Sequence, residues 1–113
     1  MSTETVLPAH LQELRRGTVV LASLIALERP GYGYALLNGL AEAGLSVDGN
    51  TLYPLLRRLE DQGLLTSEWD TTASKPRKFY RTSPLGREVR AALLDDLAAL
   101  TRSVNFLQEA STP

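Results

Sequence analysis

The stretch from Asp48 to Thr82 joins a capped amphipathic helix directly to two short strands. Asp48 is a suitable N-cap for the helix, and Gly63 is a suitable left-handed residue at its exit. The leucines of this helix recur with the i, i+3, i+4, i+7 spacing of a buried face, at Leu52, Leu55, Leu56 and Leu59. A helix followed by a hairpin is the order in which a winged-helix domain presents its recognition helix and its wing. The segment therefore predicts a winged-helix domain.

The face of this helix opposite the leucines is predominantly polar. At about 100° per residue its members are Asn50, Pro54, Arg57 and Asp61, flanked by Tyr53 and Arg58. Pro54 is expected within the first turns, where backbone amides lack partners inside the helix and a proline is tolerated. A helix that enters a DNA major groove needs a short polar N-terminal end for base edges, and Asn50 and Thr51 supply one.

A hairpin with a basic loop follows the helix. Residues 64–69 and 77–82 are partly β-branched or aromatic, and a polar run separates them as a turn. From Lys75 to Arg81 there are four basic residues and no acidic one. The side chains expected to grip the DNA backbone or minor groove from this wing are Lys75, Arg77 and Lys78.

Three helices are predicted before this segment. A short amphipathic helix is expected around residues 7–14, after Pro8, and an apolar run predicts a second helix over residues 18–27. A third is expected over residues 32–43, with Gly44 as its stop and Tyr34 only partly buried.

The last predicted helix begins at Ser83, an N-cap followed by a proline, and runs to about Gln108. Apolar residues form a coiled-coil-like seam along it, at Val89, Leu93, Leu97, Leu100, Val104 and Leu107. Such a helix is longer than the core of a small domain needs, and we infer that the seam forms a homodimer. In the alternative, the helix folds back on residues 7–27 of its own chain.

The predicted fold class is mainly α with a small β-hairpin, a winged helix-turn-helix with a long C-terminal dimerisation helix. The expected divisions are an N-terminal arm or short helix (1–15), the DNA-binding domain (16–82) and the dimerisation helix (83–110). The 113 residues, 43% of them hydrophobic, suit one domain with short extensions. Without an apolar leader or a run of about 18 apolar residues, the chain is expected to be cytoplasmic and not to span a membrane.

Composition and motifs disfavour an enzyme. The chain has no cysteine, and His10 is its only histidine, which leaves little for a nucleophilic triad or a metal site. The glycines of GYGY open a helix after another helix, unlike a phosphate-binding loop after a strand. Asp95 and Asp96 point in different directions on a helix and are expected to be solvated. We expect no catalytic residue, no metal and no cofactor.

For single residues, packing is the alternative to DNA contact. Tyr34 and Tyr53 are expected to donate hydroxyls to phosphates, although Tyr53 could pack on the wing. Arg57 is expected to contact a base or a phosphate, but it or Arg58 could pair with Asp61. The net charge of −1 gives no global attraction to DNA, so the local charge distribution has to supply it.

Three runs together resemble the PadR-like transcriptional regulators, specifically the smaller subfamily with one C-terminal helix. They are GYGYALL, TLYPLLRRLEDQGLL and RKFYRTSPLGRE, and the resemblance spans roughly residues 14–108. It implies a dimeric winged-helix repressor that binds double-stranded DNA and responds to small molecules such as phenolic acids or lipophilic, often aromatic, drugs. Carried over by motif, the DNA-facing positions are Tyr34, Asn50, Thr51, Tyr53, Lys75, Arg77 and Lys78.

Two positions depart from the family pattern. Asn50 stands where small residues are frequent, and the last helix lacks the tryptophan on which drug-binding members stack ligands; Trp69, the only one, lies on the hairpin. The leading hypothesis is a sequence-specific repressor that binds a pseudo-palindromic operator as a homodimer. The alternatives are a winged-helix module that binds protein without DNA, and a small-molecule carrier.

Overall fold

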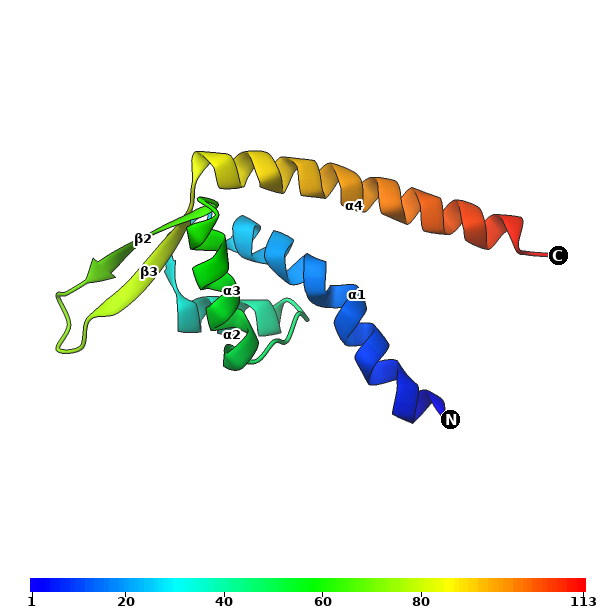
Figure 1. Cartoon of the computed structure of the whole chain (residues 1–113), viewed down its shortest axis with the longest axis horizontal. Coiled ribbons are helices and arrows are strands. Elements are labelled where there is room, and N and C mark those ends of the chain that lie inside the picture. Colours follow the sequence, from blue (N-terminus) through cyan, green and yellow to red (C-terminus); the bar gives the residue numbers. More distant parts are fainter.

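The computed structural model describes residues 1–113 as four helices around a small antiparallel sheet (Figure 1). The elements in chain order are α1 (Thr3–Ala26), β1 (Gly31–Tyr32), α2 (Gly33–Glu42), α3 (Gly49–Asp61), β2 (Leu65–Asp70), β3 (Arg77–Thr82) and α4 (Pro84–Ala110). The predicted fold class, mainly α with a β-hairpin and a long C-terminal helix, is confirmed.

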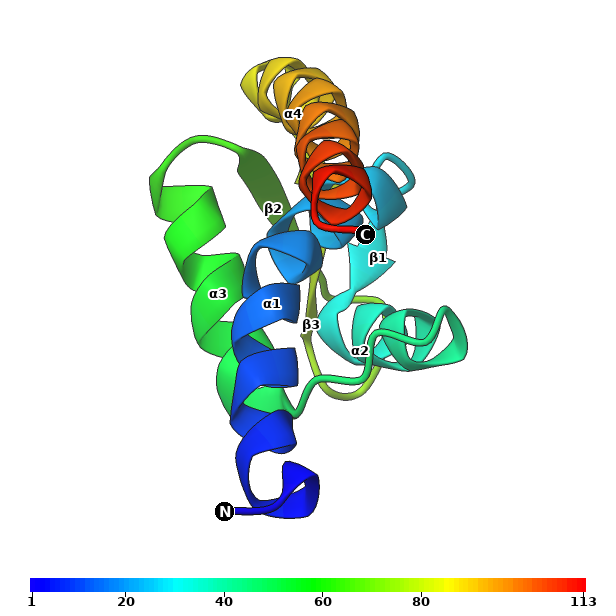
Figure 2. The same cartoon turned by 90° about the vertical axis from the view of Figure 1, so that its right-hand side faces the viewer.

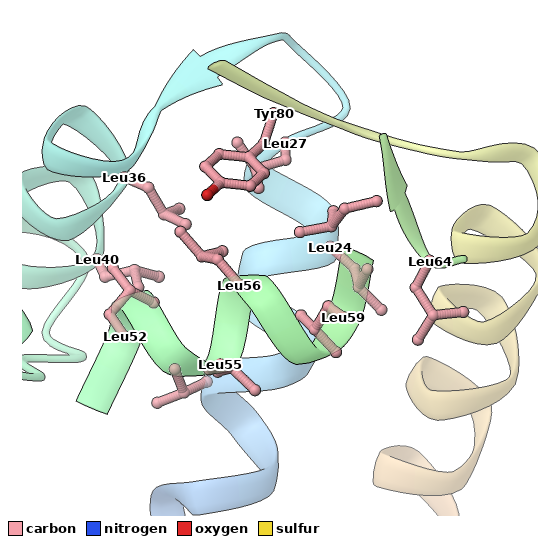
Figure 3. Packing of buried hydrophobic residues seen from close by; sticks show 12 residues of the cluster. Leu24, Leu27, Leu36, Leu40, Leu52, Leu55, Leu56, Leu59, Leu64 and Tyr80 are labelled. Carbon is pink, nitrogen blue, oxygen red and sulfur yellow. The ribbon is translucent and has the colours of Figure 1, made fainter. Parts of the chain in front are cut away.

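Helix α3 buries the face that its leucine spacing predicts. Its four leucines, Leu52, Leu55, Leu56 and Leu59, are all buried, and they pack with residues from α1, α2 and the sheet (Figure 3). The Asp48 side chain accepts a hydrogen bond from the backbone N–H of Thr51 at 3.0 Å, and Gly63 has φ 78°. The cap and the left-handed exit are therefore both present, and they fix the length of the helix.

The N-terminal region forms one helix where we expected two. Helix α1 runs without a break from Thr3 to Ala26, so the separate short helix around residues 7–14 is wrong. Gly17, between the two expected helices, faces open space. A glycine inside a helix costs about 1 kcal/mol relative to alanine, which is too little to end a helix whose C-terminal half packs in the core.

A two-residue strand that the sequence pattern did not predict completes the sheet. Strand β1 pairs antiparallel with β3, and the strand order is β1-β3-β2. Its pairs are Gly31 with Tyr80 and Tyr32 with Phe79, almost fifty residues apart in the chain. The sheet thereby ties the start of α2 to the hairpin that follows α3.

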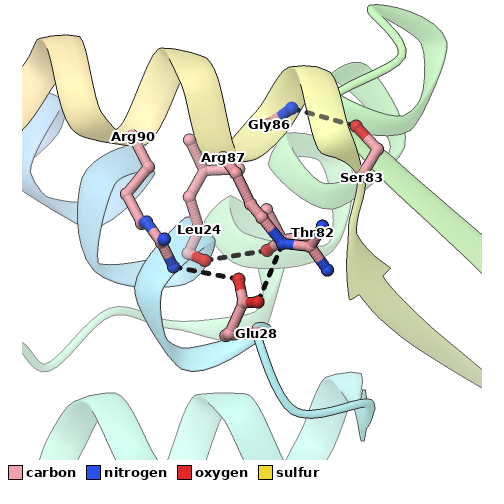
Figure 4. A network of polar contacts seen from close by, with 7 residues as sticks. All are labelled: Leu24, Glu28, Thr82, Ser83, Gly86, Arg87 and Arg90. Atoms are coloured by element: carbon pink, nitrogen blue, oxygen red, sulfur yellow. Dashed lines mark hydrogen bonds and ion pairs between the residues drawn. The ribbon is translucent and has the colours of Figure 1, made fainter.

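The junction of β3 and α4 is held by buried hydrogen bonds (Figure 4). Thr82 donates from its hydroxyl to the carbonyl oxygen of Leu24 at 2.8 Å and from its backbone N–H to that of Leu27 at 2.8 Å. The Ser83 hydroxyl accepts from the N–H of Gly86 at 3.0 Å, which confirms the predicted cap. These bonds join the end of the sheet, the start of α4 and the C-terminal end of α1.

An ion pair adds a second link between α1 and α4. Glu28, just after α1, accepts hydrogen bonds from Nε of Arg87 at 2.8 Å and from Nη1 of Arg90 at 2.9 Å (Figure 4). The bond from Arg87 is the main reason that the pKa of Glu28 lies below its ordinary value. The direction of α4 relative to the domain is thus set by both buried and exposed polar contacts.

Helix α4 projects well beyond the domain (Figures 1 and 2). The molecule measures 63 × 34 × 22 Å, and its radius of gyration of 17.0 Å exceeds the roughly 13 Å expected of a compact chain of this length. Only 18 of the 113 residues are buried, and none of them lies beyond Gly86. The second half of α4 therefore has no core of its own within the monomer.

Replacing Gly86 by alanine should lower the free energy of unfolding by about 1–3 kcal/mol. The added Cβ would lie 2.2 Å from the carbonyl oxygen of Leu64 and 2.7 Å from Cγ2 of Thr82. Urea titration followed by circular dichroism measures the change. The matched control is Gly39→Ala in α2, where nothing lies within 4 Å and helix propensity should stabilise by ~0.5–1 kcal/mol. Equal stability of the two variants would contradict the close packing at Gly86.

Candidate nucleic-acid interface

The outer face of α3 presents polar residues at the N-terminal half of the helix. Asn50, Thr51, Pro54 and Arg57 are all exposed, on the side away from the buried leucines. Neither Arg57 nor Arg58 forms the ion pair with Asp61 that was the alternative expectation. The guanidinium of Arg57 is therefore free to bind a base edge or a phosphate.

Pro54 lies within the first turns of α3, as expected, but past the amides that lack partners inside the helix. It is the sixth residue of a helix that begins at Gly49, so it falls beyond the first turn. Because proline has no N–H, the carbonyl oxygen of Asn50 lacks the i+4 donor that a regular helix would supply. This frees one backbone acceptor beside the polar residues of the outer face.

Tyr53 lies between the outer face of α3 and the start of α2. Its side chain is 40% exposed, and its ring covers two glycines: a Cβ on Gly33 would lie 2.6 Å from Cε1, and a Cβ on Gly49 would lie 3.0 Å from Cε2. The ring packs on these glycines, whereas we had considered packing on the wing. The small residue at Gly33 therefore lets α2 approach α3 while Tyr53 stays partly accessible.

The hairpin, residues 65–82, forms the wing, and Lys78 anchors it to α3. Its Nζ donates to Oε1 of Glu60 at 2.9 Å, and Glu60 also accepts from the Ser67 hydroxyl. The bond to Glu60 raises the pKa of Lys78, while the bond from Ser67, followed by that from Lys78, lowers the pKa of Glu60. Lys78 is thus an internal ion-pair partner that would have to exchange Glu60 for a phosphate.

Arg77 lies on the opposite face of the wing, in an aromatic cluster. Its guanidinium stacks over the Tyr32 ring at 4.4 Å from the centroid, donates to the Tyr34 hydroxyl at 3.2 Å, and lies 3.9 Å from Asp70. The Tyr32 and Tyr34 rings stack on each other, with centroids 5.7 Å apart. This cluster joins the base of α2 to the wing and places Tyr34 beside Arg77.

Asp70 completes that cluster from the end of β2. It accepts a hydrogen bond from the Tyr32 hydroxyl at 2.5 Å and two from Thr72, at 3.0 Å from the backbone and 2.6 Å from the hydroxyl. The Thr72 hydroxyl, followed by Tyr32, lowers the pKa of Asp70 to about 2, and the bond to Asp70 raises the pKa of Tyr32. The carboxylate therefore stays ionised at neutral pH and holds the turn of the wing.

The basic run of the wing is consequently less basic in space than along the chain. Arg77 lies near Asp70 and Lys78 pairs with Glu60, an acid from α3. Lys75, in the exposed turn, forms no ion pair. Among the cations we expected to contact DNA, Lys75 and Arg57 are unpaired, and they lie on the wing and on α3 respectively.

Several residues of the interface were not anticipated from the sequence. Tyr32, Glu60 and Asp70 orient the wing. Tyr32 and Asp70 are 38 residues apart, and the partners of Glu60 are 7 and 18 residues away, so no local spacing predicts these pairs. Trp69 is 63% exposed and stands directly opposite Lys78 in the hairpin. The only available signal for Trp69 was the strand register, which places opposite residues on the same face.

The apolar seam of α4 divides into two parts. Val89 and Leu93 are partly buried and pack against the core of their own chain. The remaining members are exposed, by 43% at Leu97, 56% at Leu100, 60% at Val104 and 64% at Leu107. The first part folds back on its own domain, as one expectation had it, and the second part is left uncovered.

A groove of about 420 Å³ lies between α1 and α4 at the start of the uncovered part. Its apolar lining comes from both helices, with Leu14 and Leu21 on one side and Leu93 and Leu97 on the other. No group of three or more histidine, cysteine, aspartate or glutamate side chains is arranged to hold a metal ion. No helix combines the length and the apolar character that crossing a membrane requires.

The sequence and the fold are both similar to those of known proteins. The model of the transcriptional regulator PadR-like family matches residues 20–92. The transcriptional regulator Rv3488 of Mycobacterium tuberculosis is 40% identical over 91 residues, which cover 80% of this chain and 82% of that protein. The crystal structure of a PadR family transcriptional regulator from Eggerthella lenta is 47% identical with a TM-score of 0.89, and the match covers 94% of this chain and 95% of that one.

A PadR-like transcription factor from Bacteroides fragilis is more distant but has the same fold. It is 32% identical with a TM-score of 0.73, over 88% of this chain and 98% of that chain. The family model covers well over half of the chain, and the relatives match it over nearly their whole lengths. The chain belongs to the PadR-like family of transcriptional regulators.

Proposed function

We propose that this protein is a sequence-specific repressor that binds a pseudo-palindromic operator as a homodimer. The observation that carries the proposal is the exposed polar face of α3, with Asn50, Thr51 and the unpaired Arg57, beside a wing fastened to the same helix. A helix of this kind suits the major groove, in which each base pair presents a distinct set of donors and acceptors. Residues 16–82 bind DNA in this proposal, and residues 83–110 join the two copies.

The contacts divide by chemistry. Asn50 and Thr51 would read base edges, while Arg57 would contact a base or a phosphate. Of the three wing cations assigned to DNA, Lys75 is unpaired, and Arg77 and Lys78 would reach phosphates by exchanging their internal partners. Tyr34 and Tyr53 would donate hydroxyls to phosphates, and both rings also have packing roles in the domain.

The uncovered half of α4 supports the homodimer. Four seam residues spaced by three and four positions are 43–64% exposed on one face, an arrangement typical of a helix that packs on a second helix. Pairing two DNA-binding domains would double the contacts with DNA, and the two-fold axis of a homodimer matches a palindromic operator. The apolar groove between α1 and α4 is where a small aromatic or lipophilic effector would lodge, and its binding there would release the operator.

A winged-helix module that binds protein without DNA is the second candidate. The internal neutralisation of Arg77 and Lys78 and the net charge of −1 favour it. A mobility-shift assay at low salt with the DNA upstream of its own gene separates the two. Selection of bound sequences from random DNA, with and without aromatic ligands, then defines the operator and the effector. No shift at low salt and no selected sequence would contradict the repressor.

Arg57→Ala should weaken operator binding and reduce the salt dependence. One lost phosphate contact flattens the slope of log K against log salt by about 0.9, whereas a lost base contact lowers specificity by ~1–3 kcal/mol. Fluorescence anisotropy over a sodium chloride series measures both. Arg102→Ala, an exposed position of α4 on the side away from the seam, is the control. Unchanged affinity and slope for Arg57→Ala would count against the proposed reading face.

Lys75→Ala and Lys78→Ala should differ in their effect on stability. Both should weaken DNA binding, but only Lys78→Ala leaves Glu60 without its cation. Its thermal midpoint should therefore fall, while that of Lys75→Ala stays at the parent value. Differential scanning fluorimetry without DNA makes the comparison. Equal midpoints would mean that the Lys78–Glu60 pair does not hold the wing.

Leu100→Glu combined with Val104→Glu should convert the dimer to a monomer. Two carboxylates in an apolar seam oppose each other across the two-fold axis and lose solvation. Sedimentation velocity reads the change in mass. Arg102→Glu introduces the same charge on the opposite face of α4 and should leave the mass unchanged. A double variant that still sediments as the parent dimer would exclude this seam as the interface.

A further inference from the structure

A basic groove lies on the flank of α3 that is turned away from the wing. It has a volume of about 620 Å³ and is formed between α1, the loop before α3 and one side of α3. Its apolar floor includes Leu11, Val19 and Leu55, and three arginines line it, Arg15 and Arg16 from α1 and Arg58 from α3. None of these arginines belongs to the polar face described above.

The charge in this groove is largely uncompensated. Arg15 and Arg58 form no ion pair, and Arg16 pairs only with Glu13 at 3.2 Å, where both side chains are highly exposed. An exposed pair of this kind contributes little energy and exchanges readily. Asp48 is the one acid in the lining, and its carboxylate already accepts the N–H of Thr51. The groove therefore presents three guanidinium groups against one occupied carboxylate.

The groove adjoins the face that we propose to read DNA. Thr51 and Pro54 line the groove and also belong to the outer face of α3, so the two surfaces are continuous. Residues of α1 and α3 line this one groove, and Figure 1 shows the wing and the N-terminal half of α1 on opposite sides of the domain. The N-terminal half of α1 and the projecting half of α4 extend to the same side of the domain, away from the wing (Figure 1).

We propose that Arg15, Arg16 and Arg58 form a second phosphate-binding flank of the DNA interface. A helix in the major groove of DNA lies between two phosphate backbones, because this DNA groove is only about 12 Å wide. The wing can supply cations to one backbone, and Arg15, Arg16 and Arg58 would supply them to the other. Arginine suits this task because its planar guanidinium binds phosphate oxygens in pairs. The inference rests on the proposed function and extends it to the first helix.

These arginines also compensate for the small number of unpaired cations on the wing. Two of the four wing cations, Arg77 and Lys78, are engaged by Asp70 and Glu60, so only Lys75 and Arg81 of the wing are unpaired. Arg15 and Arg58 add two unpaired cations on the other side of α3, beside Arg57. The DNA-facing surface is therefore basic even though the whole chain has a net charge of −1.

The test compares the salt dependence of operator binding for Arg15→Gln, Arg58→Gln and the double variant. Each lost phosphate contact should flatten the slope by about 0.9 and the double loss by about 1.8. Sequence preference in a selection experiment should stay the same, because phosphate contacts do not read bases. Arg15→Lys combined with Arg58→Lys should recover most of the slope, since the charge is restored. Arg102→Gln is the matched control on α4 and should leave the slope unchanged.

Two results would overturn the inference. If the double variant folds as the parent does, by circular dichroism and thermal midpoint, and keeps the parent slope, the groove does not meet DNA. An organic anion as its natural occupant would give this outcome, and it would leave the proposed function intact. If the parent protein itself binds no DNA at low salt, the proposed function fails and this inference fails with it.

Discussion

The hydrogen bonds of Thr82 decide how the two halves of the molecule are placed. Its hydroxyl and its backbone N–H bond to carbonyl oxygens at the end of α1, and Ser83 then caps α4. A buried polar group is costly unless it is satisfied, so this short segment has one favourable position against α1. The helix that leaves it, α4, carries the exposed seam, and α3 packs on the same core. The geometry of this junction therefore determines how far apart the two α3 helices would lie in a dimer.

The charges around α3 and the wing follow from packing between distant segments. The basic run of the wing meets Glu60 from α3 and Asp70 from its own turn, and the aromatic cluster around Tyr32 and Tyr34 holds Arg77. These contacts use cations to orient the wing. Unpaired arginines on α1 and α3 lie on the other flank. A chain that is almost neutral overall can in this way carry a locally basic surface, because attraction to a polyanion depends on where the unpaired charges lie.

The candidate site was predictable to the extent that it lies on one helix. The period of the leucines placed Asn50 and Arg57 on the outer face of α3, and both are exposed there. Sequence reasoning gave no access to the partners of Arg77 and Lys78, or to the groove that joins α1 to α3, because those contacts connect residues far apart in the chain. The same limit explains β1, whose two residues become a strand only because β3 is beside them.

What the sequence by itself determined is local: the buried face and cap of α3, the left-handed exit at Gly63, and the start of α4 at Ser83. Each depends on side chains within about one or two helical turns of one another, so spacing and residue type suffice. The tertiary structure decided that α1 is continuous, that Lys78 forms an ion pair with Glu60, and that only the second half of the α4 seam is left exposed. Those outcomes depend on which surfaces remain exposed after the core has formed, and local sequence spacing does not predict which surfaces these are.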